Sequence, residues 1–248
     1  MGDKILVLFG RSYDKPILGL GDVVYQTEKF LSNPEDFKLI LFTGGEDITP
    51  SLYGETSPEG VCWFSESRDK FETLVYNLAI KHKILMAGIC RGMQFFNVMN
   101  GGRMMHHIGS HNGGIHDMET IDGRKIPVNS IHHQMIIPAK GTKIVGWSSP
   151  SLSDVYIGNK DKRVKYNGKE NEAAIFTNTR CFGVQYHPEL MDKTMEGYKF
   201  FRNMVELALT SDWEDFVNSY QRGVISGDNK KEISNDETNT NNNRYSSV

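Results

Sequence analysis

The sequence predicts an α/β protein in which helices cover both faces of a mainly parallel central sheet. Short, strongly apolar runs lie at 4–9, 39–43, 84–89 and 182–186, as expected for parallel strands that are buried on both faces. Helical spacing of apolar residues separates these runs, and alternating strands and helices imply a covered sheet. The length of 248 residues allows a substantial core without disulfide bonds.

The remaining elements follow in chain order. Helical spacing is present over 25–31 and 69–81, and a third helix should run from residue 91 to Met99. Between 119 and 177, short alternating runs joined by Asp-Gly, Lys-Gly and Asn-Gly turns predict antiparallel hairpins at the edge of the sheet. A helix of about 16 residues should begin near Lys193, and a second should follow with Trp213, Phe216 and Tyr220 on one face.

The motifs described below are interleaved along the chain, so we expect one domain over residues 1–225. Residues 226–248 are polar and rich in asparagine. Such a segment has almost nothing apolar to bury, and we expect it to be disordered.

Composition limits the classes of function. The formal net charge of −3 gives no electrostatic attraction to nucleic acid or to an anionic membrane, and no apolar run approaches the roughly 20 residues of a membrane span. Three widely spaced cysteines fit a reducing compartment better than a disulfide framework. The first residues lack the segments of a signal peptide. We therefore expect a cytoplasmic protein with no nucleic-acid or membrane partner.

Residues 84–101 carry the strongest chemical signal. A buried strand leads into a helix, and Cys90 stands at the corner between them. Gly88 and Gly92 lie two residues either side of Cys90, where a sharp strand-to-helix turn has no room for side chains. The helix N-terminus favours a thiolate over a thiol. The pattern predicts a nucleophile elbow that carries sulfur; an ordinary buried thiol is the alternative that so short a pattern leaves open.

A second signal is the end of the apolar run that begins at Phe182. His187 and Glu189 follow this run, with Pro188 between them. Residues two apart in an extended segment point to the same side, and proline stiffens the backbone. A carboxylate can thereby orient a histidine that serves as base and acid for a nucleophile. We predict that Cys90, His187 and Glu189 form a catalytic triad.

Four separated motifs together resemble one known family. They are Gly44–Glu55, close to the pattern G-G-x-D-x-x-P-x-x-Y-G-E; Arg68-Asp69 with Glu72, followed by the elbow and Gln94; Val128–Gln134; and Phe182–Glu189. They resemble the class I glutamine amidotransferases, in the branch that includes the γ-glutamyl-γ-aminobutyrate hydrolases. The resemblance implies a three-layer, flavodoxin-like fold with a small antiparallel edge sheet. The stretch 150–172 is longer and more charged than is usual for the branch. The resemblance therefore does not identify the group attached to the γ-glutamyl nitrogen.

The resemblance implies a cysteine-dependent amidohydrolase that forms a glutamyl thioester and releases glutamate plus ammonia or an amine, without a cofactor. Its oxyanion needs two N–H donors. One should be the backbone N–H of Arg91, directly after the nucleophile, and the resemblance assigns the other to Gly45. It also implies substrate-binding roles, with ordinary structural roles as the alternatives; the residues are Gly44, Gln94, Ser130 and His132.

Four histidines at 106, 107, 111 and 116 suggest a metal site by their short spacing. The stretch also contains three glycines, no nearby cysteine or helix fixes a tetrahedron, and the cysteine mechanism needs no metal. We therefore predict no metal site, and expect this stretch to be a flexible loop at the mouth of the pocket.

Three functions remain open from the sequence. The first is a free-standing hydrolase of a small γ-glutamyl conjugate, which the Gly44–Glu55 and Val128–Gln134 motifs favour. The second is a glutaminase subunit that passes ammonia to a synthetase partner on another chain. The third is a catalytically silent binding protein, against which the intact Cys90, His187 and Glu189 argue. A homodimer is compatible with all three.

Overall fold

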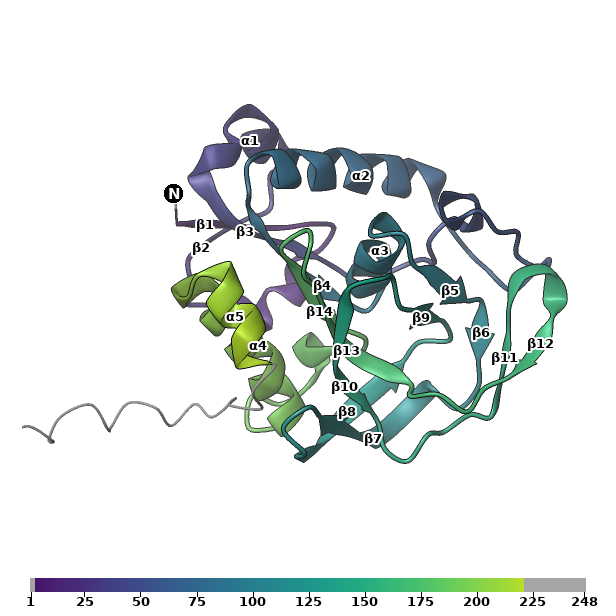
Figure 1. Cartoon of the computed structure of the whole chain (residues 1–248). Helices are drawn as coiled ribbons and strands as arrows, with labels where there is room; N and C mark the ends of the chain where they lie inside the picture. The colour runs from purple at the N-terminus through teal and green to yellow at the C-terminus, as the bar shows by residue number, and fades with distance from the viewer. Residues whose placement is uncertain (1–2, 221–248) are drawn as a thin grey trace, which may run out of the picture.

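The computed structural model describes residues 3–220, with the side chain of residue 161 excepted. Its centre is a nine-stranded sheet in the order β2-β1-β3-β4-β14-β13-β10-β7-β8 (Figure 1). The strands from β2 to β14 run parallel, and the remaining strands pair antiparallel. The strands of this sheet are β1 Lys4–Val7, β2 Asp22–Val24, β3 Phe37–Phe42, β4 Leu85–Ile89, β7 Asn112–Thr120, β8 Lys125–Ile131, β10 Thr142–Ser148, β13 Asn171–Phe176 and β14 Cys181–Val184.

Helices cover both faces of the parallel part of the sheet. Helices α1 (Thr27–Ser32), α2 (Glu66–Lys81) and α3 (Arg91–Met99) lie on one side, and α4 (Glu196–Thr210) and α5 (Trp213–Ser219) lie on the other (Figure 1). The alternation of side chains along each strand explains this arrangement. Ile40 of β3 packs with Phe96 of α3 in one core cluster, whereas Leu39 packs with Phe201 of α4 in the other. The α/β prediction is confirmed.

Two small sheets border the large one. One contains β6 (His107–Ile108), β11 (Val155–Ile157) and β12 (Arg163–Lys165), and the other pairs β5 (Arg103–Met105) with β9 (Met135–Ile137). The histidine-rich stretch is therefore not the flexible loop that its glycines predicted. It contains β6, which pairs with the much later strand β11, and Asn112 begins β7, which pairs with the next strand, β8.

Other differences concern the ends of elements. The last long helix begins at Glu196 rather than near Lys193. Strand β1 ends at Val7 rather than at residue 9, where Phe9 adopts a positive φ of 55°. Within residues 3–220, no helix is both long and apolar enough to span a bilayer. The predicted domain end at 225 and the predicted disordered tail, 226–248, lie outside the described residues.

Candidate active site

Cys90 occupies the corner between β4 and α3. Its backbone has a φ of 50° and a ψ of −103°, a strained conformation for a residue with a side chain. The flanking glycines are sterically required. A Cβ on Gly88 would lie 2.6 Å from the carbonyl carbon of Gly92, and a Cβ on Gly92 would lie 2.3 Å from the carbonyl oxygen of Phe42. The turn is thus the tight strand-to-helix corner that the two glycines predicted.

The pairing of β4 with β14 brings the two signals of the sequence together. The strands are parallel neighbours, with Ile89 opposite Val184, and the Cys90 N–H donates to the Val184 carbonyl oxygen at 2.8 Å. The segments that follow β4 and β14 therefore leave the sheet at its carboxyl edge, where α/β proteins bind their ligands. His187 follows β14 by three residues, so it lies over the same edge as Cys90.

His187 and Glu189 are directly hydrogen bonded. His187 Nδ1 lies 2.7 Å from Glu189 Oε1, and both side chains are at most 10% exposed. The segment is not extended as expected, because Pro188 begins a 3-10 turn over Pro188–Leu190. Asn129 holds the backbone of His187 from both sides, since its Oδ1 accepts from the His187 N–H at 2.8 Å and its Nδ2 donates to the His187 carbonyl at 2.9 Å.

The environment of His187 stabilises its charged form. Burial disfavours the charged ring, but hydrogen bonds and charge attraction from Cys90 and Glu189 outweigh burial and raise the pKa of His187 to about 10. The imidazole therefore carries a second proton at neutral pH, beside the sulfur of Cys90. A protonated histidine in this position can deliver a proton to a leaving nitrogen.

The Gly44-Gly45 loop follows β3, the strand next to β4. A Cβ on Gly44 would lie 2.8 Å from His187 Cε1, so glycine lets the loop contact the imidazole. Gly45 has a φ of 146°, and its Cβ would lie 1.9 Å from Arg68 Nη1. Arg68 holds the loop from outside, since its Nη2 donates to the Gly44 carbonyl at 2.8 Å and its Nη1 pairs with Glu46 at 2.6 Å.

The side chain of Arg91 forms a buried ion network beneath the corner. Its guanidinium pairs with Asp69 at 2.5 Å and also with Glu72, and all three side chains are at most 3% exposed. Asp69 in turn accepts from the Thr49 N–H at 3.0 Å. The network joins the start of α3 to α2 and to the loop after β3. From the sequence, only the backbone N–H of Arg91 was given a role. The ion pairs of the Arg91 side chain hold that N–H in place.

One cavity of about 220 Å³ brings several predicted residues together. Cys90, Gly45, Gln94 and His132 line it. This volume is below the roughly 300–1,000 Å³ of sites for drug-sized ligands, so it suits a group the size of one amino acid. The other residues that line the cavity are Glu46, Asp47, Trp63, Ile131, His133 and Gln134.

Two of the predicted substrate-binding residues also have partners within the protein. Gln94 Nε2 donates to Gln185 Oε1 at 3.2 Å and to the Gln134 carbonyl at 3.3 Å. Ser130 is buried and donates its hydroxyl to the His111 carbonyl at 2.7 Å; it is not among the residues that line the cavity. Roles of Gln94 and Ser130 in substrate binding stay predictions.

Comparisons with known proteins found similar sequences and similar folds. A family model described as Peptidase C26 matches residues 28–125. A glutamine amidotransferase-like protein of Lactococcus lactis subsp. lactis is 27% identical over 189 residues, which is 68% of this chain and 71% of that protein. The crystal structure of a glutamine amidotransferase from Thermotoga maritima covers 90% of this chain and 92% of its own, with a TM-score of 0.51 and 16% identity. Together these likenesses support a place in the Peptidase C26 or class I glutamine amidotransferase-like superfamily.

A further relative extends the comparison to a larger enzyme. The glutamine-hydrolyzing GMP synthase of Dictyostelium discoideum is 28% identical over 171 residues, which is 68% of this chain but 20% of that protein. Taken together, the relatives support a hydrolase or amidotransferase.

Three further residues contact the candidate site but were not predicted. Asn129 and Gln185 lie inside quoted motifs; Gln185 donates to Cys90 Sγ at 3.4 Å. Tyr13 lies 6.3 Å from His187 between ring centroids. Burial, with the charges of Glu189 and Cys90, raises the pKa of Tyr13 to about 12, so its hydroxyl stays protonated. Nothing in the sequence around Tyr13 marks it, because only the fold brings it to the site.

Proposed function

We propose that the chain is a cysteine-dependent amidohydrolase that attacks the side-chain amide of glutamine or of a γ-glutamyl conjugate. The observation that carries the proposal is the arrangement of Cys90, His187 and Glu189 at one sheet edge, beside a cavity that also contains Gly45. A neutral amide needs a strong nucleophile, a proton for the departing nitrogen and donors for the oxyanion. Each requirement has a candidate group here.

The first half of the reaction forms a thioester. The Cys90 thiolate attacks the γ-carbonyl carbon, a C–S bond forms, and negative charge moves to the carbonyl oxygen. The backbone N–H groups of Gly45 and Arg91 stabilise that oxygen. The C–N bond then breaks as imidazolium His187 gives its proton to the nitrogen, which leaves as ammonia or an amine.

The second half of the reaction is hydrolysis. Neutral His187 takes a proton from water as the water oxygen attacks the thioester carbonyl. A C–O bond forms and the C–S bond breaks, which releases glutamate and restores the thiolate and imidazolium pair. Glu189 keeps Nδ1 of His187 protonated throughout, so that Nε2 exchanges the proton.

Two versions of this activity differ in the group that leaves with the amide nitrogen. We favour a free-standing hydrolase of the γ-glutamyl-γ-aminobutyrate hydrolase kind, because the two branch motifs contact each other at the cavity: His133 Nε2 lies 3.1 Å from Asp47 Oδ1. The alternative is a glutaminase subunit that supplies ammonia to a separate synthetase. It is supported by the likeness to a glutamine-hydrolyzing synthase of which this chain matches about a fifth.

Turnover by the isolated chain separates the two versions. A free-standing hydrolase should release glutamate from a panel of γ-glutamyl amides without a partner, and should prefer a substituted amide to glutamine. A glutaminase subunit should cleave only glutamine, and slowly. Cys90→Ala should abolish every such activity while leaving the fold intact. Turnover by Cys90→Ala at the wild-type rate would contradict the proposal.

A further inference from the structure

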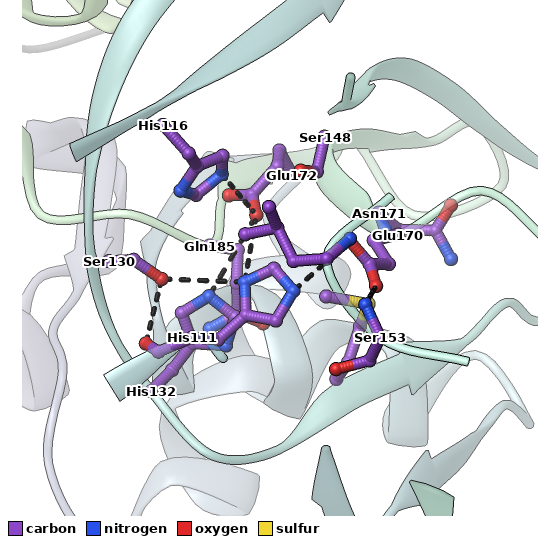
Figure 2. A network of polar contacts seen from close by, with 12 residues as sticks. His111, His116, Ser130, His132, Ser148, Ser153, Glu170, Asn171, Glu172 and Gln185 are labelled. Atoms are coloured by element: carbon purple, nitrogen blue, oxygen red, sulfur yellow. Dashed lines mark hydrogen bonds and ion pairs between the residues drawn. The ribbon is translucent and has the colours of Figure 1, made fainter. Parts of the chain in front are cut away.

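A group of buried histidine and glutamate side chains lies beside the candidate site (Figure 2). His111, His132 and Glu172 are each at most 1% exposed. One ligand atom from each of these three residues lies within 4.8 Å of the others. They come from separate parts of the chain: His111 precedes β7, His132 follows β8, and Glu172 belongs to β13.

The hydrogen bonding of His132 directs a lone pair into this group. Its Nδ1 lies 3.0 Å from the Gln134 carbonyl oxygen, which can only accept, so Nδ1 carries the ring hydrogen and Nε2 has a free lone pair. His132 Nε2 points towards Glu172 Oε1 at 3.8 Å. Among the residues described, neither His132 Nε2 nor Glu172 Oε2 has a hydrogen-bond partner.

His111 is arranged in the same way. Its Nε2 lies 3.2 Å from Glu170 Oε2 but is not hydrogen bonded within the described residues; when the ring hydrogen is on Nε2, next to this carboxylate, Nδ1 has the lone pair. His111 Nδ1 faces Glu172 Oε1 at 3.7 Å and Ser130 Oγ at 3.4 Å. The Ser130 hydrogen is already donated to the His111 carbonyl at 2.7 Å. Two imidazole lone pairs and a carboxylate therefore face one another, an arrangement that is unfavourable in a buried place unless a cation joins them.

We propose that His111 Nδ1, His132 Nε2 and a carboxylate oxygen of Glu172 bind a divalent transition-metal ion, with Zn²⁺ as the ion that fits best. Two imidazoles and one carboxylate are a known set of zinc ligands. The contacts of 3.7 and 3.8 Å to Glu172 are too long for a hydrogen bond. They are within a few tenths of an ångström of the edge of a tetrahedron with bonds of about 2.0–2.1 Å.

The surroundings fit a metal site in two further respects. Metal-binding histidines commonly donate their other N–H to a carboxylate or a backbone carbonyl. His132 Nδ1 lies 3.0 Å from the Gln134 carbonyl oxygen, and Glu170 Oε2 lies 3.2 Å from His111 Nε2. Glu170 and Glu172 bring two carboxylates into the buried group. His116 Nε2 lies 3.1 Å from Glu172 Oε1, and a divalent ion balances the charge that this contact leaves.

The proposed ion would be structural and would act on the cavity through His132. It would join the beginning of β7, the end of β8 and β13, and His132 itself lines the cavity that contains Cys90. Only His111 and His116 of the four clustered histidines face this group. His106 pairs with Glu55 at 2.8 Å instead. The neighbouring histidines alone predicted no metal site, whereas the proposed ligands come from three segments.

The test is a titration of the chelator-stripped full chain with Zn²⁺ alone, followed by X-ray absorption spectroscopy of the zinc-loaded protein. We expect one Zn²⁺ per chain, with nitrogen and oxygen scatterers at about 2.0–2.1 Å that include two imidazoles. His111→Ala and Glu172→Gln should each weaken binding at least 100-fold. Glu170→Gln should weaken it about 10- to 100-fold, because it removes the partner of a ligand.

His107→Ala is the matched control, because His107 lies in the same stretch but is exposed and faces His133. It should bind Zn²⁺ as the wild type does, and so should Cys90→Ala, so the result is independent of the proposed catalysis. The absence of stoichiometric Zn²⁺ would overturn the proposal and would leave a network of shared protons. Zinc that persists in folded His111→Ala and Glu172→Gln would also overturn it. If those variants do not fold, the ligand set seen by absorption spectroscopy in the wild type decides.

Discussion

Replacement of Glu189 by glutamine tests how the site stabilises the protonated form of His187. Glu189→Gln keeps the size of the side chain and an oxygen for His187 Nδ1, but it removes the negative charge that lies 2.7 Å away. Burial continues to disfavour the imidazolium, and only Cys90 remains to favour it. We therefore expect the pKa of His187 to fall, and the ring to lose part of its proton near neutral pH.

The size of the effect follows from the environment of the pair. A pKa of about 10, against 6.5 for an ordinary histidine, corresponds to about 5 kcal/mol in favour of the imidazolium. Glu189 is one of the two partners that produce this preference. A hydrogen bond to a buried charged group contributes about 1.5–3 kcal/mol. The expected loss in kcat/KM is therefore roughly 10- to 150-fold.

Two measurements on the same variants check this prediction. The pH profile of kcat/KM on a γ-glutamyl amide gives the loss, and NMR of the labelled histidine ring gives the pKa directly. Asp192→Asn is the control, because Asp192 is a fully exposed carboxylate on the same segment whose partner is Thr194; it should behave as the wild type. If Glu189→Gln retained kcat/KM within about twofold and an unchanged pKa of His187, the assigned role of Glu189 would be wrong.

Three further predictions follow from the same geometry. Gly45→Ala should lower kcat/KM by roughly 100- to 1,000-fold, because its Cβ would displace the Arg68 guanidinium; near-wild-type kinetics would exclude Gly45 as an oxyanion donor. Arg91→Met should lower the urea-derived free energy of unfolding by about 3–5 kcal/mol, because it leaves buried Asp69 without a cation and leaves Glu72 with Arg68 alone; a loss below about 1 kcal/mol would contradict the ion network. Charged His187, whose pKa is raised to about 10, stabilises the fold fully below pH 6.5, and this contribution is lost as the pH rises through 10. In urea unfolding, the free energy of unfolding should therefore fall less between these pH values in Cys90→Ala than in the wild type. Equal losses in the two proteins would refute the interaction of Cys90 with charged His187.

The parallel part of the sheet was predictable because β1, β3, β4 and β14 are strongly apolar and are separated by segments with helical spacing. The runs at 39–43 and 84–89 became β3 and β4 almost residue for residue. The errors lie where distant pairing overrides local preference. The glycines after His107 predicted a loop, but β6 pairs there with β11, and nearly fifty residues separate the two in sequence.

The candidate site was predictable to the extent that its residues lie in compact motifs. Cys90 with its glycines, and His187 with Glu189, carry their geometry within a few residues. Tyr13 and the partners of Glu172 do not, because the fold brings them together from separate segments. The γ-glutamyl substrate and the roles of Gln94, Ser130 and His132 stay predictions, as does a single domain over residues 1–225.

The proposed mechanism depends most directly on a covalent bond between Cys90 and a glutamyl group. The most direct measurement is mass spectrometry of the acid-quenched full chain during turnover of glutamine or a γ-glutamyl amide, with peptide mapping of the modified residue. We predict a glutamyl thioester on the peptide that contains Cys90, and no adduct in Cys90→Ala. A turnover-competent chain that carries its acyl group on another residue, or that turns over when Cys90 is replaced, would contradict the account.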